Sequence, residues 1–389
     1  MAEKRICFFC ERWASGGIES FIYNLLSQNQ VALGEVDIVA ARLEDSVFTR
    51  PLQQRGIRFF ELSGNINNLP NNHRAFRRLL RERNYDGVHL HIYHGLSLYY
   101  AVIARQEGIP LRIAHSHNGA LRKSAAKWLK MWIHRGSVFL FKNVATHWLS
   151  CSPVAGTFMF GTQERRKREF LWVPNGIDTK RFSMDESQRD LVREHLAISN
   201  CFVIGNVGRW CHQKNQRFLL EMLAHMAEED GDICLLLIGE GEEEKALRQL
   251  ARQYEVEDRV IFYGPSQEVE KMLWAMDLYV QPSLFEGLPL AVVEAQAAGL
   301  PVLCADSISH QVRLTKELQF LSLAAGARVW AQHILKKKEE MWPYETACKW
   351  QSHMRGQADQ VRKAGYDIYD TARLLEQIYR EGVWKDGIL

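Results

Sequence analysis

The stretch LYVQPSLFEGLPLAVVEAQAAGLPVLCAD, residues 278–306, contains a strand, a loop, a helix and a second strand in that order. The apolar run LYVQPS has the length of a strand, and LFEG forms the loop after it. Pro289 lies near the first position of the helix LAVVEAQAAG, where its missing N–H costs nothing, and Gly299 ends the helix. Because two strands joined through a helix run parallel, this unit predicts a parallel sheet.

The same alternation of strand and helix runs through the chain in two series. The first series contains RICFFC, EVDIVAA, GVHLHI, RIAHSH and HWLSCS, and after VPNGIDTKRF the second contains CFVIGNVG, ICLLLIGEG, VIFYG, LYVQPS and PVLCAD. Strict alternation predicts the α/β class, with parallel sheets covered by helices on both faces. A chain of 389 residues is long enough for two domains. We therefore expect two Rossmann-like domains facing a central cleft.

The expected domain limits follow from the break between the two series. Pro174, Asn175 and Gly176 form a turn at this break. The first domain is expected at 1–172 and the second at 173–365. The remaining residues, 366–389, include an amphipathic helix that can pack on either domain, including back on the first.

The composition is that of an ordinary globular protein. Hydrophobic residues make up 47% and charged residues 24%, and the net charge is +3. The eight cysteines have no framework spacing and indicate reduced thiols in the cytoplasm, and CFFC at 7–10 lies inside a strand, where it is expected to pack in a core. The N-terminus resembles neither a secretion signal nor an anchor, and no apolar stretch reaches about 18 residues, so any membrane contact is expected to be peripheral.

Basic residues cluster at 73–83, 121–135 and 163–169. Each cluster is either a solvated helix face or a surface that meets anionic lipid or an anionic substrate. Residues 121–135 mix cations with tryptophans and aliphatic side chains, a combination that suits the headgroup layer of a membrane. The clusters lack interleaved stacking aromatics on a strand face, so no nucleic acid partner is expected.

The loops that follow the strands are the candidate sites, because ligands bind at the carboxyl ends of strands in a parallel sheet. Gly16 and Gly17 follow the first strand and either bring backbone amides against a phosphate or serve only a tight turn. Arg209 and Lys214 stand between a strand and a helix N-terminus, which suits a diphosphate or a solvated pair of cations.

Glu286 and Glu294 lie in a run that is otherwise apolar or made of small residues. Burying a carboxylate without a partner costs several kcal/mol, about what a domain can spare. Glu286 is expected in the loop and Glu294 one turn into the helix, where both can reach one extended polar ligand. Carboxylates that accept hydrogen bonds from hydroxyl groups are typical of ribose and sugar sites. Glu294 alone would also be favoured near a helix N-terminus by the helix dipole.

The order of the motifs resembles family 4 of the retaining GT-B glycosyltransferases over nearly the whole chain. The motifs are Gly16-Gly17-x-Glu19, VPNGID, GRWCHQKN, GEGEEEKALR and the run from YGPSQEVEK to AAGLPV. HSHN, CSPVAGTFMFG and FLSL resemble the bacterial branch that builds capsular and exopolysaccharides. The resemblance implies the GT-B fold and transfer of a sugar from a nucleotide-sugar, with a UDP-sugar as the expected donor, to a glycan or lipid-linked saccharide with retention of anomeric configuration.

The resemblance also implies roles for individual residues. Glu294 is expected to hold the nucleotide ribose and Glu286 to contact hydroxyls of the transferred sugar. Arg209 and Lys214 match the cations that bind the diphosphate. The other expected donor-binding residues are Tyr263 and Gly264, at the nucleobase, with Gly16, Gly17, Asn206, Glu240, Gly287, Leu288 and Leu290.

Histidines in two strands complete the expected site. His117 resembles the active-site histidine of the family, with His115 as the alternative because the register is ambiguous. His91 and His115 are also candidates for contacts with the acceptor or the cleft. Each of them can instead be a satisfied polar group at a strand end.

No acidic nucleophile is apparent, so the resemblance implies front-face attack in which the leaving diphosphate assists deprotonation of the acceptor. The expected catalytic residues are His117, Glu286, Arg209 and Lys214, the two cations stabilising the charge on the diphosphate. That role replaces a divalent metal, so neither a metal nor a cofactor is expected. The pair Gln311-Val312 departs from the Glu-Val of many relatives at a loop-anchoring position.

Two other classes of function remain open at this stage. A GT-B nucleotide-sugar epimerase or phosphorylase would act without an acceptor sugar, and a non-catalytic partner of a transferase would not need an intact donor site. The expected partners are a nucleotide-sugar donor, a lipid-linked or soluble saccharide acceptor and the anionic inner face of the cytoplasmic membrane. Acceptors of this family are usually lipid-linked at that face, so we expect a cytoplasmic, peripheral protein.

Overall fold

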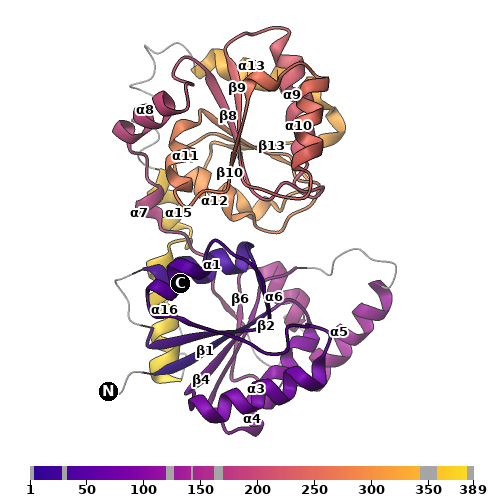
Figure 1. Ribbon diagram of the computed structural model, residues 1–389, viewed down its shortest axis with the longest axis vertical. Helices are drawn as coiled ribbons and strands as arrows, with labels where there is room; N and C mark the ends of the chain where they lie inside the picture. The colour runs from indigo at the N-terminus through magenta and orange to yellow at the C-terminus, as the bar shows by residue number, and fades with distance from the viewer. Residues whose placement is uncertain are drawn as a thin grey trace. The chain divides into compact units, whose positions relative to one another are not determined.

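The computed structural model describes residues 4–28, 33–119, 127–141, 143–161, 170–341 and 357–382 (Figure 1). The chain divides into two compact units, one made of Met1–Gly176 with Asp367–Leu389 and the other of Ile177–Tyr366. The sequence placed the two limits at 172 and 365, whereas the structure places them after residues 176 and 366. Each unit has its own sheet and its own core.

The first unit contains a seven-stranded sheet in the order β3-β2-β1-β4-β5-β6-β7, and every pair of neighbours is parallel. Its strands are β1 (Arg5–Trp13), β2 (Glu35–Leu43), β3 (Arg58–Glu61), β4 (Gly87–Ile92), β5 (Leu111–Ser116), β6 (His147–Ser150) and β7 (Leu171–Trp172). Its helices are α1 (Gly17–Ser27), α2 (Thr49–Gln54), α3 (Leu69–Arg83), α4 (Tyr99–Gln106), α5 (Lys127–Phe141), α6 (Pro153–Phe160) and α16 (Ile368–Glu381), with a 3-10 turn, η1, at Gly95–Leu98.

Both faces of the first sheet are buried, as its apolar strands predict. Alternate residues of β1 belong to different cores, because Ile6 and Phe8 pack in one cluster whereas Cys7 and Phe9 pack in the other. Cys7 and Cys10 are fully buried and unpaired, and burial raises the pKa of both thiols well above its usual range. The predicted core role of the CFFC run is confirmed.

The last described helix, α16, packs on the first unit. Ile368, Leu375 and Ile378 belong to the same core cluster as Ile6 and Phe8 of β1. The helix contacts α1, and Figure 1 shows it in yellow beside the indigo N-terminal strands. The sequence left open which domain this helix covers, and the structure places it on the first.

The second unit contains a six-stranded parallel sheet in the order β10-β9-β8-β11-β12-β13. Its strands are β8 (Phe202–Val207), β9 (Ile233–Ile238), β10 (Val260–Gly264), β11 (Leu278–Gln281), β12 (Val302–Ala305) and β13 (Leu318–Leu321). Its helices are α7 (Thr179–Phe182), α8 (Glu186–His195), α9 (Gln216–Ala227), α10 (Glu244–Gln253), α11 (Val269–Ala275), α12 (Leu290–Ala297), α13 (Ala327–Met341) and α15 (Gln357–Lys363).

The stretch at 278–306 forms the predicted strand–helix–strand unit of β11, α12 and β12. Pro289 is the residue that precedes α12, and Gly299 has a φ of 82°, a left-handed conformation that glycine adopts without strain. The amide of Leu300 donates to the Ala295 carbonyl at 3.0 Å, which closes the last turn. The helix therefore begins directly after Pro289 and ends just before Gly299, as predicted.

Three strands were not predicted, and all three lie at sheet edges. They are β3 and β7 at the two edges of the first sheet and β13 at one edge of the second. Each has four residues or fewer. An edge strand pairs on one side only and needs a less continuous apolar pattern, so its sequence signal is weak.

We expect Leu375→Ala in α16 to destabilise the first unit by about 2–5 kcal/mol, because it removes a fully buried side chain and leaves a cavity between α16 and the sheet. Urea unfolding of the full chain measures the change. Gln377→Ala, at an exposed position of the same helix, is the matched control. Equal stability of the two variants would contradict the packing of α16 on this core.

Candidate functional site

The second sheet reverses its strand order between β8 and β11, and in open parallel sheets ligands bind beside such a point at the carboxyl ends of the strands. The loops after these two strands, 208–215 and 282–289, are joined by hydrogen bonds. The Leu284 amide donates to the Gln213 carbonyl at 2.9 Å, and the Gln213 side chain donates to the Phe285 carbonyl at 3.0 Å. The loops that carry Arg209, Lys214 and Glu286 therefore form one surface.

Lys214 and Glu286 form an ion pair on this surface. The ammonium nitrogen lies 2.9 Å from one carboxylate oxygen of Glu286 and 3.0 Å from the other. The side chains are 19% and 8% exposed, so the pair is largely desolvated and stronger than a surface pair. Glu286 also accepts hydrogen bonds from Ser283 and, at 3.1 Å, from Gln281. The structure thus brings the predicted diphosphate cation and the predicted sugar-binding acid together.

A buried polar network supports Glu286 from below. Gln281 is fully buried, donates to Ser283 at 2.7 Å and accepts from the Tyr279 hydroxyl at 2.7 Å. Asn206 is 1% exposed and donates to the Val280 carbonyl at 2.8 Å. The prediction that Asn206 binds the donor does not fit this burial, because its amide already supports the neighbouring strand. Gln281 and Ser283 were missed, although polar residues in an apolar strand were a usable signal.

Glu294 lies in the second turn of α12 and is 9% exposed. Burial raises the pKa of its carboxyl to about 7, against the opposing effect of the Arg181 charge. Arg181, in α7, donates to Glu270 at 2.6 Å. Sequence reasoning missed Arg181, because nothing in the chain shows that α7 lies near α12. A carboxyl group poised near neutral pH is a common property of binding and catalytic sites.

Arg209 and the expected nucleobase residues lie at the exposed rim of the same sheet. Arg209 pairs with Glu242 at 3.0 Å, and both side chains are 57% exposed, so this pair contributes little and a diphosphate can displace it. Tyr263 is 39% exposed at the end of β10, and the Gly264 carbonyl accepts from the Gly239 amide at 2.8 Å. The structure therefore leaves Arg209 and Tyr263 accessible to a ligand.

The remaining predicted donor residues of this unit also lie near strand ends. Glu240 is exposed after β9, and its carbonyl accepts from the Trp210 amide at 2.9 Å. Gly287 is exposed and Leu288 is half-buried, and both precede α12, of which the buried Leu290 is the first residue. Helix N-termini carry unpaired backbone N–H groups that favour anions.

The glycine loop of the first unit is exposed and lies at the start of α1. The Glu19 carboxylate, 3% exposed, folds back over this loop and accepts from the Ala14 amide at 3.3 Å. A Cβ atom on Gly16 would lie 2.7 Å from a Glu19 oxygen, so a larger residue there would make this side chain shift, whereas Gly17 has open space. Burial raises the pKa of Glu19 to about 7. Glu19 therefore lies close to Gly16, and the space beside Gly17 is open.

The first sheet reverses its strand order between β1 and β4. Glu11 in β1 pairs with His94, just after β4, at 3.3 Å and accepts from the Ser97 hydroxyl at 2.6 Å. Sequence reasoning missed this ion pair because its members are far apart in the chain. The pair marks a second polar surface at the carboxyl ends of strands.

Four histidines lie next to one another on β4, on β5 and directly after β5. His89 and His91 are two residues apart on β4, and His91 is in register with His115 of β5, while His117 follows that strand. His89, His91 and His115 are fully buried, whereas His117 is partly exposed. The burial of His91 and His115 does not fit the predicted contact with an acceptor or a cleft, because neither ring reaches the surface. Of the two alternatives for the active-site histidine, His117 is the accessible one.

Ring nitrogens of His89, His91 and His115 lie within 4.8 Å of one another, close enough for one metal ion to reach three ligands. His89 and His115 also hydrogen-bond to each other at 3.2 Å, and His115 bonds to the Val173 carbonyl at 3.3 Å. A metal ion would have to break these bonds. The hydrogen-bonded arrangement satisfies the buried nitrogens of His89 and His115 by itself.

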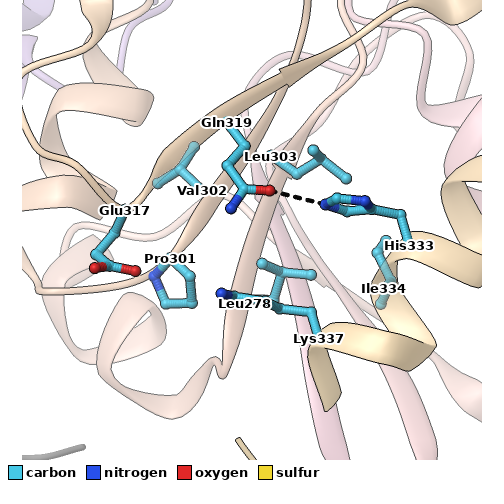
Figure 2. A pocket seen from close by; sticks show the side chains of 9 residues that line it. All are labelled: Leu278, Pro301, Val302, Leu303, Glu317, Gln319, His333, Ile334 and Lys337. Carbon is cyan, nitrogen blue, oxygen red and sulfur yellow. Dashed lines mark hydrogen bonds between the residues drawn. The ribbon is translucent and has the colours of Figure 1, made fainter. Parts of the chain in front are cut away.

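A small cavity lies at the amino ends of strands in the second sheet, beneath α13 (Figure 2). It encloses about 10 Å³, room for a water molecule at most. His333 and Gln319 hydrogen-bond across it at 2.9 Å, and Leu278, Pro301 and Val302 line it at the amino ends of β11 and β12. The cavity is too small for a sugar or a nucleotide and lies away from the loops described above.

Comparison with known proteins gives two family matches that together span most of the chain. Residues 15–181 match the family model described as Glycosyltransferase Family 4, and residues 187–322 match that of Glycosyl transferases group 1. The putative glycosyltransferase EpsF of Bacillus subtilis is 28% identical over 99% of this chain and 98% of its own length. The UDP-Gal:alpha-D-GlcNAc-diphosphoundecaprenol alpha-1,3-galactosyltransferase of Escherichia coli is 28% identical over 58% of each chain.

The fold matches that of solved glycosyltransferase structures. Anabaena Alr3699/HepE, solved in complex with UDP and glucose, superposes with a TM-score of 0.76 over 97% of this chain and 100% of its own, at 18% identity. WaaG, a glycosyltransferase involved in lipopolysaccharide biosynthesis, superposes with a TM-score of 0.69 over 96% and 99% of the two chains, at 15% identity. The predicted GT-B fold is confirmed.

The raised pKa of Glu294 predicts a pH-dependent stability. The folded state holds its proton up to about pH 7, whereas the unfolded chain releases it near pH 4.5, so the free energy of unfolding falls as the pH rises between these values. Glu294→Gln removes this loss. At pH 8 its free energy of unfolding is expected to exceed that of the wild type by up to about 3 kcal/mol, and at pH 4 the two values should differ little. Urea unfolding at both pH values measures this. Glu19 is present in both proteins, so its contribution to the pH dependence cancels in the comparison. Glu228→Gln, at an exposed position, is the control. A pH-independent difference would contradict the raised pKa.

Proposed function

Because the chain belongs to family 4 of the GT-B glycosyltransferases, we propose that it transfers a sugar from a nucleoside diphosphate sugar to a saccharide acceptor with retention of anomeric configuration. The observation that carries the proposal is the Lys214–Glu286 pair at the β8–β11 strand reversal. A cation and a carboxylate that lie side by side and are largely buried suit a diphosphate and the hydroxyl groups of a sugar. UDP is the proposed nucleotide, in line with the UDP bound to the Anabaena structure.

Each acid and cation has a part in the proposed reaction. The bond between the anomeric carbon and the diphosphate oxygen breaks, a bond from the acceptor oxygen forms on the same face, and the acceptor proton passes to the leaving diphosphate. Arg209 and Lys214 stabilise the negative charge that develops on that group. Glu286 accepts hydrogen bonds from the transferred sugar, and Glu294 from the ribose. This electrostatic role does not call for a divalent metal, so we propose metal-independent transfer.

The acceptor is proposed to be a lipid-linked saccharide, in capsule or exopolysaccharide synthesis. The Escherichia coli relative acts on a saccharide carried by diphosphoundecaprenol. An enzyme acting on such an acceptor works at the surface of a membrane. In the described part of the chain, no helix combines the length and apolar character needed to cross a bilayer. We propose that the chain works at the cytoplasmic face of the membrane through a peripheral surface.

Helix α5 is the proposed surface. Its buried face includes His134, which accepts from the Gly95 amide at 2.8 Å. Its other face exposes large apolar side chains: Trp128 at 68%, Leu129 at 46%, Trp132 at 73%, Ile133 at 46%, Phe139 at 70% and Leu140 at 70%. Lys130 and Arg135 are exposed among them, whereas Arg122 and Lys123 of the predicted cluster lie outside the described residues. Exposed aromatic residues mixed with cations suit an anionic headgroup layer.

The first test is binding and transfer by the two glutamate variants. Glu294→Ala should lose affinity for UDP, because the carboxylate that holds the ribose is removed, whereas Glu286→Ala should keep UDP affinity and lose sugar transfer. Calorimetry with UDP and a transfer assay with UDP-sugars and a GlcNAc-diphospho-lipid acceptor measure the two effects, and EDTA should change neither. Conversion of the nucleotide-sugar without an acceptor would favour an epimerase or phosphorylase, and loss of transfer in EDTA would contradict the mechanism.

The second test concerns α5. Trp128→Ser combined with Trp132→Ser should lower binding to vesicles of anionic lipid by at least tenfold. Each tryptophan that is buried in the headgroup layer on binding contributes about 1.5–3 kcal/mol. Binding should also fall at high salt, because each basic residue near the headgroups contributes about 1 kcal/mol. Co-sedimentation measures both. Leu191→Ser, at a 58% exposed leucine of the second unit, is the matched control. Unchanged binding of the double variant would leave α5 as a solvated face.

A further inference from the structure

The carboxyl group of Glu294 is buried without a hydrogen bond. It lies in the second turn of α12, is 9% exposed, and accepts no hydrogen bond from the described residues. Glu286, in the loop before the same helix, differs because its carboxylate is bound by Ser283 and Lys214. A buried carboxyl group without hydrogen bonds depends on nearby charges for its ionisation. The charges around Glu294 therefore decide which form it takes.

An ion pair between α7 and α11 supplies two of these charges. The Arg181 guanidinium lies 2.6 Å from the Glu270 carboxylate and also donates to the Gln267 carbonyl at 2.5 Å. The side chains of the pair are 34% and 10% exposed, so water screens their charges less than those of a surface pair. Helix α7 contacts α12, and Figure 1 shows α7, α12 and α15 side by side. The pair thus lies beside the helix that carries Glu294.

The two members of this pair act on Glu294 in opposite directions. Burial raises the pKa of the Glu294 carboxyl to about 7, while the positive charge of Arg181 lowers this pKa and the negative charge of Glu270 raises it. Lys214 lowers the pKa as well, with a smaller effect than either. Because the two charges of the pair oppose each other, Glu294 is only partly ionised near neutral pH.

Few other titratable groups lie on the elements beside α12. Strands β11 and β12 contribute Tyr279 and Cys304, and burial raises the pKa of both far above neutral, so both are uncharged. The remaining charged residues of α7, α11 and α15 are not buried, and they are Lys180, Lys271, Asp359, Arg362 and Lys363. Water screens these charges. The pair and Lys214 are therefore the charges that control Glu294.

We propose that the Arg181–Glu270 pair sets the charge of Glu294 and that binding of the nucleotide-sugar donor releases a proton from this carboxyl group. A carboxylate can accept a hydrogen bond on each oxygen, whereas a protonated carboxyl group uses one oxygen as a donor. Two ribose hydroxyls therefore favour the ionised form, and the proton passes to the solvent. The inference rests on the proposed contact between Glu294 and the ribose. Arg181 acts through Glu294 and is a positioning residue.

The affinity for the donor should therefore rise with pH. Below the pKa of Glu294 each pH unit should lower the affinity by about tenfold, and above it the affinity should level off. UDP-glucose is the probe, because it lacks the terminal phosphate of UDP, a kind of group that titrates near pH 6. Calorimetry of the full chain between pH 5.5 and pH 8.5 measures the affinity, and buffers of different ionisation enthalpy give the number of protons released.

Variants of the pair should move this pH profile in opposite directions. Arg181→Met should weaken UDP-glucose binding at pH 6.5 by about 3–10-fold and by less at pH 8.5, because the lost cation favoured the carboxylate. Glu270→Gln should strengthen binding at pH 6.5 by about 2–3-fold. Arg181→Lys keeps the charge and should restore the wild-type profile. The matched controls are Arg252→Met and Glu257→Gln, at an exposed ion pair of the same unit.

The charge of Glu294 can also be followed without a ligand. Carbon-13 spectra of the carboxyl groups, with Glu294→Gln to identify the signal, should give a higher titration midpoint in Arg181→Met and a lower one in Glu270→Gln than in the wild type. The double variant Arg181→Met, Glu270→Gln leaves no unpaired charge and serves if Arg181→Met alone does not fold. Its midpoint should exceed that of Glu270→Gln, because the two proteins differ only in the charge of Arg181.

Equal midpoints in all these proteins, or shifts of both single variants in the same direction, would overturn the proposal. A loss of UDP-glucose affinity in Arg181→Met that is equal at every pH would also overturn it, because a structural role alone predicts that result. An affinity of the wild type that does not change with pH would refute the proton release. Should the midpoints shift as expected in a chain that binds no UDP-glucose, the proposed function fails and the control of Glu294 by the pair stands.

Discussion

The parallel pairing of β8 with β11 is the constraint on which the donor surface depends. Strand order reverses there, so the two following helices diverge to opposite faces and leave their loops against each other. The loops approach closely enough for Lys214 to reach Glu286, and the amides and carbonyls of the two loops satisfy one another. Asn206, Tyr279 and Gln281 then fill the space below with hydrogen-bonded polar groups. The charges at the surface are held by the strands beneath them rather than by the loops alone.

Sequence patterns predicted the fold through the interior of each sheet. Strands buried on both faces, such as β1 and β8, have continuous apolar runs that are hard to mistake, whereas β3, β7 and β13 are short edges with little apolar pattern. The placement of candidate residues in loops after strands was predictable where chemistry alone marks a residue, as for Arg209 and Glu286. It was not predictable where burial decides the role. Asn206, His91 and His115 are polar residues of the expected types, and only the packing around them shows that they are buried and not accessible to a ligand.

Buried polar groups are handled in two ways in this protein. Gln281 and the pair His89–His115 have hydrogen-bond partners for their side chains within the protein, which makes them supports. Glu294 is also buried, but burial raises the pKa of its carboxyl to about 7, so its charged form is disfavoured where it lies. Whether a buried polar residue acts as a support thus depends on its hydrogen-bond partners, a property that residue type does not reveal.

The place of α16 has a consequence for how the chain is synthesised. The second unit is continuous from Ile177 to Tyr366, so all of its core residues are synthesised before α16 is. The first unit is translated earlier but waits for Ile368, Leu375 and Ile378 to cover Ile6 and Phe8. The unit that begins the chain is therefore the last to finish folding. Until then its central strand carries an uncovered apolar face, which is the surface that a nascent-chain chaperone would bind.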